Sequence, residues 1–155
     1  RIVEGEERAS AVRNATFNAD ARWREVYTKV ETAGLETVDK QECYKVLVTP
    51  RGEKQQTQFF DKKTGLRVKT TIPYESPQGE VFLEMILEDY REVDGIRIPF
   101  MTRNIAGVQE QTMIVEKVEH NREFPAGHFD LPAEVKTLLE NRKNADKNPS
   151  EKGRP

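Results

Sequence analysis

Three carboxylates near the middle of the chain, Glu84, Glu88 and Asp89, are the strongest candidates for acid–base chemistry. Paired carboxylates transfer protons when their surroundings push their pKa values apart. Here they occupy positions of an expected strand, and nothing near them in the sequence indicates a perturbed pKa. We therefore interpret them as a solvated edge, with a hydrolase as a distant alternative. Gly-rich phosphate loops, Gly-x-Ser-x-Gly and His-Glu-x-x-His motifs are absent from the sequence, so we do not expect an enzyme.

The residues that could bind a metal ion do not form a recognisable pattern. His120 and His128 flank a Pro-Gly loop, with Glu119 and Asp130 nearby, but their spacing matches no standard metal site. We expect surface histidines and no metal or other cofactor. The single cysteine, Cys43, excludes an intrachain disulfide and any zinc site made of several thiolates. It lies in an apolar run, so we expect an inert, half-buried thiol.

The composition excludes several classes of protein. The chain has 155 residues, with 25 Lys and Arg against 27 Asp and Glu, and a formal net charge of −2. This length suits one domain. The lack of a basic excess argues against nucleic acid as a partner, and no apolar run approaches the ~20 residues of a transmembrane helix. Hydrophobic residues make up only 35% of the chain. Either part of the chain therefore stays unfolded, or one thin sheet buries most of the apolar surface.

The N-terminal segment 1–27 has the pattern of helices. Trp23, Val26, Tyr27 and Val30 recur at the spacing of one face of an amphipathic helix, and residues 6–14 form a weaker second candidate. From about Thr28 the hydrophobic period changes from that of a helix to that of a strand. We therefore expect the helical segment to give way to a sheet at this point.

Segment 28–120 has the pattern of an antiparallel meander of about seven strands. Apolar residues alternate with polar ones in three clear runs, at 44–48, 66–74 and 96–100. Asp94-Gly95 is the sharpest hairpin signal, because a type I′ turn requires positive φ at both central positions. The connections are too short to contain crossover helices, so neighbouring strands must be antiparallel.

The C-terminal part is expected to add a loop and a short helix over 121–140. Pro132 suits the first turn of this helix, and Glu134 lies favourably near its positive end. Segment 141–155 is strongly polar, and we expect a disordered tail. The fold class is therefore α+β: a single domain over 1–140, with a curved antiparallel sheet covered by short helices at both chain ends.

One strand differs from the others. In the run 81–87, apolar residues lie on both faces, so something must cover each side of the sheet here. The flexible side chain of Met and the flat ring of Phe can bind irregular hydrophobic ligands, although they can equally form a core beneath helices. The candidates for lining a hydrophobic ligand cavity are Phe59, Val68, Leu83, Met85, Leu87, Ile98, Phe100 and Met113.

Four segments of the chain resemble a known family. They are the runs YKVLVTP at 44–50, FDKKTGL at 60–66, YREVDGIRIPF at 90–100 and FDLP at 129–132. These runs look like those of bacterial outer-membrane lipoprotein-sorting proteins, the LolA/LolB group of periplasmic lipoprotein carriers. The resemblance spans roughly residues 28–139. It implies an unclosed antiparallel barrel with helices over a hydrophobic cavity. Because the chain has fewer strands than that family, it corresponds to the C-terminal part, a half-barrel.

The resemblance implies a non-enzymatic carrier whose cavity holds the acyl chains of a lipid or lipoprotein. Such a protein resides in the periplasm or at the outer membrane, although no signal peptide is visible in the sequence. It would contact the membrane peripherally. The alternative is a structural or interaction module whose apolar sheet face packs on a partner chain or on a missing N-terminal half. The open edge of a half-barrel would also allow a homodimer.

Overall fold

The computed structural model describes residues 3–16, 19, 21–76 and 79–147. The chain forms two compact units, Arg1–Val118 and Glu119–Pro155. The first unit contains helices α1 (Gly5–Asn14) and α2 (Trp23–Val26) and all the strands of the described residues; the second contains helix α3 (Ala133–Lys147). The predicted single domain over 1–140 stays a prediction.

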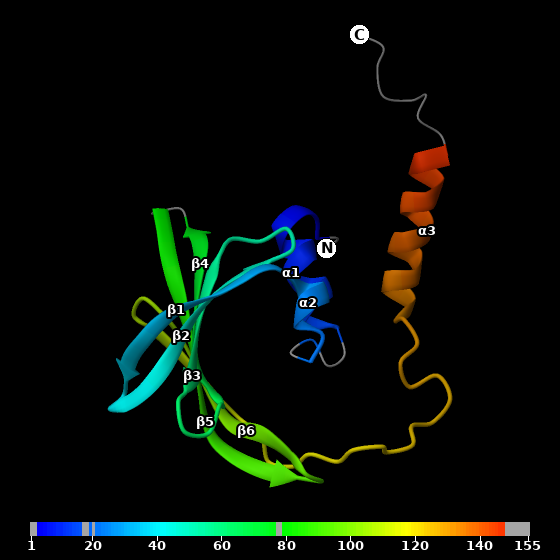
Figure 1. The fold of residues 1–155 in the computed structure, drawn as a ribbon. Coiled ribbons are helices and arrows are strands. Elements are labelled where there is room, and N and C mark those ends of the chain that lie inside the picture. Colours follow the sequence, from blue (N-terminus) through cyan, green and yellow to red (C-terminus); the bar gives the residue numbers. More distant parts are fainter. Residues whose placement is uncertain (1–2, 17–18, 20, 77–78, 148–155) are drawn as a thin grey trace. The chain divides into compact units, whose positions relative to one another are not determined.

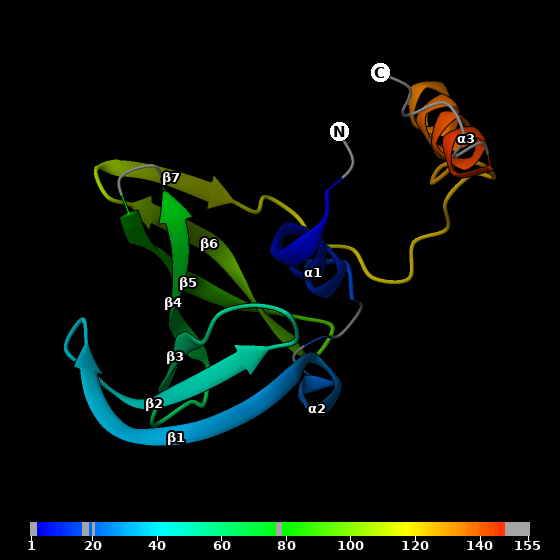
Figure 2. The same ribbon diagram turned by 90° about the horizontal axis from the view of Figure 1, so that it is seen from above.

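The first unit is built on one sheet of seven strands, whose order in space is their order in the chain. Every neighbouring pair is antiparallel. The strands are β1 (Tyr27–Val38), β2 (Gln41–Pro50), β3 (Gln56–Asp61), β4 (Arg67–Ser76), β5 (Gly79–Val93), β6 (Ile96–Ala106) and β7 (Gln109–Ile114). This confirms the predicted α+β class with a curved, open antiparallel meander. In Figures 1 and 2 the sheet bends strongly, and α1 and α2 lie on its concave side.

The turns follow from the residues at their centres. Asp94 and Gly95 both have positive φ, 50° and 80°, which confirms the hairpin predicted between β5 and β6. Asp39 and Lys40 repeat this geometry between β1 and β2, with φ of 45° and 67°. Aspartate tolerates the left-handed region because its short side chain bonds locally. The long side chain of Lys40 forms no such local bond with the described residues, so the steric cost of its positive φ is not offset.

Helix α1 covers the predicted segment 6–14, whereas α2 is shorter than the hydrophobic pattern predicts. The stripe of Trp23, Val26, Tyr27 and Val30 was expected on one helix, but α2 ends at Val26 and the last two residues belong to β1. The β-branched residues Thr28, Val30 and Thr32 favour extended backbone, and β2 offers a complete row of hydrogen-bond partners. Pairing with β2 therefore overrides the helical spacing.

The core of the first unit is small. Its buried hydrophobic residues are Cys43, Val48, Phe59, Leu87 and Phe100. Cys43 is fully buried rather than half-buried as predicted, because it lies in the small core, and burial raises the pKa of its thiol. Only a thin layer of apolar side chains is needed because most strand positions facing outward are charged or polar. This is how the sheet forms with a low apolar fraction.

Helix α3, in the second unit, begins directly after Pro132, whose carbonyl oxygen accepts hydrogen bonds from the amides of Val135 and Lys136. It continues to Lys147, past the boundary at residue 140 where the sequence predicted a disordered tail. Residues 141–147 include Arg, Lys and Ala, which have high helix propensity, so a strongly polar composition does not stop the helix. The rest of the predicted tail, 148–155, lies outside the described residues. No helix in the described part of the chain is long and apolar enough to cross a membrane.

Candidate functional site: an apolar cavity on the concave face

The first unit contains a cavity of about 500 Å³ on the side of the sheet where α2 lies. It draws on residues that are far apart in the sequence, from α2 to β6. Most of its lining is apolar or aromatic. The lining residues are Trp23, Tyr27, Val30, Val46, Val48, Gln58, Phe60, Gly65, Leu66, Arg67, Leu87, Tyr90, Arg97 and Pro99.

Cross-strand register explains why these side chains meet. Val46 pairs with Gln58, and Val48 pairs with Val30 on its other side. Paired residues of neighbouring strands lie on the same face, so β1, β2 and β3 present these side chains together. The valines therefore form an apolar floor at the β1–β2 side of the cavity.

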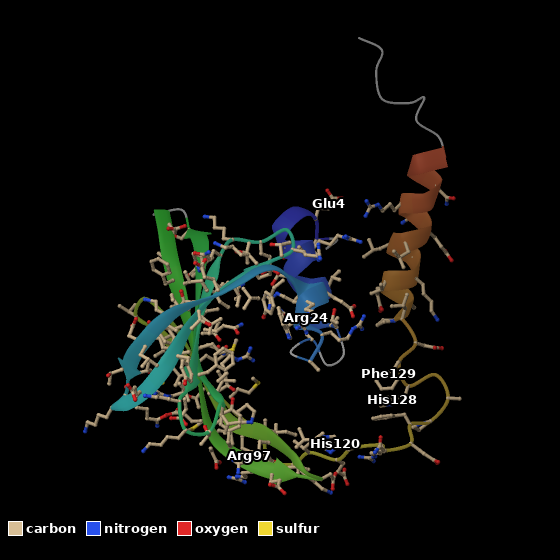
Figure 3. All side chains as sticks on the ribbon, viewed as in Figure 1. Glu4, Arg24, Arg97, His120, His128 and Phe129 are labelled. Atoms are coloured by element: carbon tan, nitrogen blue, oxygen red, sulfur yellow. The ribbon has the colours of Figure 1, made fainter. Side chains whose placement is uncertain are left out.

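Two phenol groups of the lining are held by hydrogen bonds. The amide Nε2 of Gln58 donates to the Tyr27 hydroxyl at 3.0 Å, and the Tyr90 hydroxyl donates to the carbonyl oxygen of Arg67 at 2.7 Å. Their polar tips are satisfied, so the rings offer apolar surface to the cavity. On α2, the Arg24 guanidinium lies 4.2 Å from the centroid of the Trp23 ring (Figure 3).

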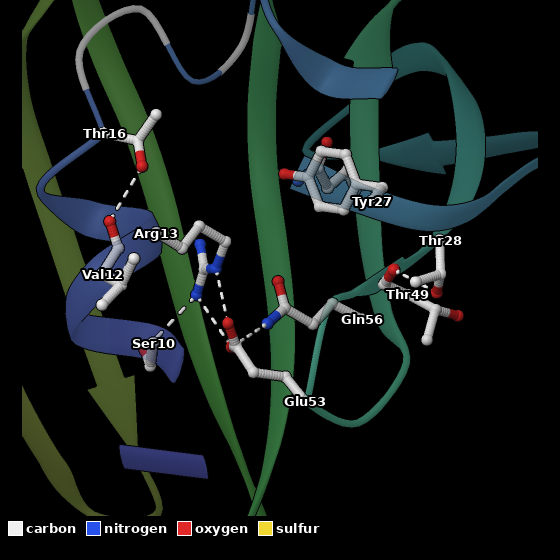
Figure 4. A network of polar contacts seen from close by, with 10 residues as sticks. Ser10, Val12, Arg13, Thr16, Tyr27, Thr28, Thr49, Glu53 and Gln56 are labelled. Carbon is white, nitrogen blue, oxygen red and sulfur yellow. Dashed lines mark hydrogen bonds and ion pairs between the residues drawn. The ribbon is translucent and has the colours of Figure 1, made fainter. Parts of the chain in front are cut away.

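An ion pair fixes α1 beside the sheet. The Arg13 guanidinium contacts the carboxylate of Glu53, in the loop between β2 and β3, through Nε at 2.8 Å and Nη2 at 3.0 Å. Gln56 donates from Nε2 to the same carboxylate at 3.2 Å (Figure 4). The Glu53 side chain is only 7% exposed, so this two-armed contact is shielded from water. It ties helix and sheet together on the concave side.

The structure does not bring the predicted cavity residues together. Of the eight, Leu87 lines the cavity. Leu83 and Met85 lie on the same face of β5 as Leu87 but farther along the strand, and Leu83 borders a shallower hollow next to β7. Met113 is 55% exposed on β7, paired with Thr102, the partner of Leu87.

The remaining predicted residues lie away from this cavity. Phe59 is aligned with Lys45 and Lys69, in the row next to that of Gln58, and its ring is buried on the opposite face of the sheet. The lysine ammonium of Lys45 lies 6.0 Å from the ring centroid. Val68 falls at a register shift between β3 and β4 and borders a different cavity.

Ile98 and Phe100 are not among the lining residues either, although Phe100 shares a face of β6 with Thr102, the partner of Leu87. The Arg91 guanidinium lies 4.5 Å from the centroid of the Phe100 ring, which is 5% exposed. Phe100 is therefore a core residue of the first unit. That any of the eight contacts a ligand stays a prediction.

The sequence reasoning missed most of the lining. Trp23, Tyr27 and Val30 were assigned to a helical cover rather than to a cavity wall, and Phe60 was passed over for its neighbour Phe59. A usable signal existed in the aromatic pair Trp23 and Tyr27, four residues apart, at the start of the expected sheet. The alternation within β3 could not assign the faces, because both Phe59 and Phe60 are aromatic.

A second cavity of about 560 Å³ has a different lining. Its wall includes the carboxylates Asp39, Asp61, Glu88 and Asp89. Asp61 accepts hydrogen bonds from the Thr64 hydroxyl and amide, both at 2.7 Å, and from the Lys63 amide at 3.2 Å. These donors, that hydroxyl first, hold the pKa of Asp61 below its ordinary range.

Each carboxylate of the candidate acid–base cluster has a basic partner. Lys69 contacts Glu84 at 2.6 Å, and Arg103 contacts Glu88 at 2.8 Å. Arg91 contacts Asp89 at 2.6 Å, and its hydrogen bond lowers the pKa of that carboxyl group. A general acid needs a raised pKa. The geometry therefore supports the interpretation as a solvated, ion-paired edge.

In the second unit, His128 lies among aromatic rings. His128 stacks on Phe124, with ring centroids 4.8 Å apart, and meets Phe129 edge to face (Figure 3). Within the described residues, no group of three or more His, Cys, Asp and Glu side chains is arranged to hold a metal ion. The aromatic contacts explain the position of His128 without a ligand role.

Comparisons with known proteins identify no family for the chain. No family model matches, and no curated protein matches. Among solved structures, the chain is similar to a DUF1329 family protein from Desulfovibrio piger ATCC 29098, with 24% sequence identity and a TM-score of 0.42. The match covers 50% of this chain and 34% of that chain, so the chain spans about a third of the protein that it resembles.

Proposed function

We propose that this protein is a non-enzymatic lipid-binding or lipoprotein-binding protein, whose apolar cavity holds acyl chains. The observation that carries the proposal is the cavity of about 500 Å³ between α2 and strands β1 to β6. This volume lies within the ~300–1,000 Å³ typical of small-ligand sites. The lining combines aliphatic floor residues with aromatic rings whose polar tips are already bonded. Such a surface favours hydrocarbon over polar solutes.

The energetics favour a chain-like ligand. Each methylene group moved from water into the cavity contributes about 0.8 kcal/mol, so affinity rises about fourfold per added methylene until the cavity is full. The carboxylates of Glu84, Glu88 and Asp89 each form an ion pair with a basic side chain. Binding without chemistry is thus the simplest use of the site.

The resemblance of four strand and turn segments to LolA/LolB-type carriers supports a role in the bacterial cell envelope. The protein then works in the periplasm or against the outer membrane. There it carries lipid or the acyl chains of lipoproteins and contacts the membrane only peripherally. It requires no metal or organic cofactor for this role.

The test is saturable binding of an uncharged fluorescent hydrophobic probe to delipidated protein, together with native mass spectrometry of the purified protein. Val30→Asn places an amide in the cavity wall, and we expect about tenfold weaker probe binding because the amide must be desolvated. Val108→Asn is the matched control, since Val108 is fully exposed in the turn between β6 and β7. Absence of saturable binding and of bound acyl species would refute the proposal.

A second candidate is a structural module that pairs with another chain through the sheet edge. The observation behind it is that β7, the last strand of the sheet, exposes Met113 by 55% and Ile114 by 69%. Open edges with apolar side chains promote strand pairing. Light scattering separates the two candidates: a stable dimer that takes up no probe favours the module, and a monomer that takes up the probe favours the carrier.

A further inference from the structure

A row of uncharged side chains crosses one face of the sheet from β3 to β7. In the strand register, Gln58 pairs with Thr70, Thr70 with Met85, Met85 with Asn104, and Asn104 with Gln111. Paired residues of neighbouring strands lie on the same face, and Gln58 lines the apolar cavity. The row therefore lies on the face of the cavity, and Met85 is its one apolar member.

Two members of this row carry buried polar atoms that are not hydrogen-bonded. Oγ1 of Thr70 and Oδ1 of Asn104 are shielded from water, and neither has a hydrogen-bond partner among the residues that the structure describes. Thr70 is only 5% exposed; Gln58 is equally buried, but its amide donates to the Tyr27 hydroxyl. Leaving a buried polar group unpaired costs free energy, so nearly all such groups in folded proteins are bonded. Two of them in one row indicate a site for hydrogen-bonding groups from outside the chain.

The spacing of the two atoms limits what can bind both. Thr70 and Asn104 lie two strands apart, on either side of Met85, which corresponds to about 9.6 Å between the strands. A hydrogen bond of about 2.8 Å at each end leaves roughly 4 Å between the two bonding atoms of the ligand. A single hydroxyl group cannot span this distance, whereas two hydroxyl groups on neighbouring carbon atoms can.

The chemistry of the two atoms favours hydroxyl groups over charged groups. The amide oxygen of Asn104 only accepts hydrogen bonds, and the Thr70 hydroxyl both donates and accepts. An oxyanion offers acceptors alone, so it cannot bond to Asn104 Oδ1. An ammonium group would lose its hydration in surroundings that supply no opposite charge. A neutral group with two donors satisfies both atoms.

The row can be reached from the surface of the sheet. Asn104 also borders the shallower hollow next to β7. Met85, between the two polar residues, has an unbranched side chain with three rotatable bonds, which can turn aside to admit a ligand. At the other end of the row, Gln58 leads into the apolar cavity. A polar head group and a hydrocarbon chain thus find adjoining sites on one face.

We propose that this face binds neutral amphiphiles whose head group carries two neighbouring hydroxyl groups, as in a monoacylglycerol. The head group bonds to Thr70 and Asn104, and the hydrocarbon chain extends into the apolar cavity toward Val46 and Val48. This inference rests on the proposed function, because it requires the cavity to hold hydrocarbon. It adds the chemical class of the ligand and its orientation.

The test compares dodecane-1,2-diol, dodecan-1-ol and dodecyl methyl ether as competitors of the uncharged fluorescent probe. A purely apolar site would bind the ether best and the diol worst, because each hydroxyl group must leave water. We expect the reverse order, with the diol displacing the probe at a concentration at least about fivefold below that of the ether. Glycerol alone should displace no probe, because it lacks the chain.

Variants assign this order to the two polar residues. In Thr70→Val, which keeps the branched shape, and in Asn104→Leu, we expect the preference for the diol over the ether to disappear. Thr71→Val is the matched control, because Thr71 lies on the opposite face of β4, paired with Thr57 and Glu84. Without ligand, Thr70→Val should also raise the melting temperature by about 4 °C, because an unpaired hydroxyl group is no longer buried.

Each outcome decides one of the two proposals. If no hydrophobic probe binds, the proposed function fails and this inference fails with it. If the probe binds but the ether competes as well as the diol, the carrier stands and the selection of two-hydroxyl head groups is refuted. A preference for the diol that survives in both Thr70→Val and Asn104→Leu would likewise refute it, because the hydroxyl groups would then bond elsewhere.

Discussion

The two large cavities of the first unit have similar volumes, about 500 and 560 Å³, and opposite chemistry. They meet at Leu66, Leu87 and Tyr90, and beyond these residues they use different parts of the sheet. The first is apolar with two arginines, and the second is lined by carboxylates, of which Asp61, Glu88 and Asp89 are held by hydrogen bonds or ion pairs. Volume alone therefore does not indicate a binding site. What distinguishes the first cavity is its mostly aliphatic and aromatic wall, to which no carboxylate of the described residues belongs.

The neighbours Phe59 and Phe60 provide the strongest test of whether the apolar cavity is the binding site. Phe59 is 5% exposed on the face opposite the apolar cavity. We expect Phe59→Ala to reduce the free energy of unfolding by about 3 kcal/mol, because it leaves a void in a small core. Urea denaturation followed by circular dichroism measures this. If that variant does not fold, Phe59→Leu serves instead, with an expected loss of about 1 kcal/mol and unchanged probe affinity.

Phe60 should show the reverse effect. It lines the apolar cavity and is only half-buried. We expect Phe60→Ala to weaken probe binding by roughly tenfold, because contact area with the hydrocarbon is lost. Its effect on stability should be smaller than that of Phe59→Ala. Fluorescence titration measures the probe affinity of Phe59→Ala and Phe60→Ala. Equal probe affinities of the two variants would show that the ligand does not occupy this cavity.

Asp61 in the second cavity gives the smallest expected effect. Its pKa in the folded state is depressed by hydrogen bonds from Thr64, so the unfolded state binds the proton more tightly. The stabilisation is present above the ordinary aspartate pKa and is lost as the pH falls through the depressed value. We expect Asp61→Asn to flatten the decline of the melting temperature between pH 5 and about pH 3. Probe affinity at neutral pH should not change.

Local patterns predicted the fold better than the site. The β5–β6 hairpin followed from Asp94-Gly95, and the strands followed from alternation. The cavity depends on contacts that no local pattern contains: Trp23 on α2 and Pro99 on β6 line the same space. The register shift at Phe59 and Phe60 likewise determines which face each ring occupies. Register arises from the whole sheet, so single-strand reasoning chose Phe59, the ring on the opposite face.

The strictly sequential strand order of the sheet also has a consequence for how the chain folds. Each strand pairs only with the strands before and after it in the sequence. Every loop that closes is therefore short, and the entropy lost at each step is small. The sheet can grow hairpin by hairpin from whichever end of the chain is free first. A chain that is threaded through a narrow channel could thus begin to fold before its last strand has left it.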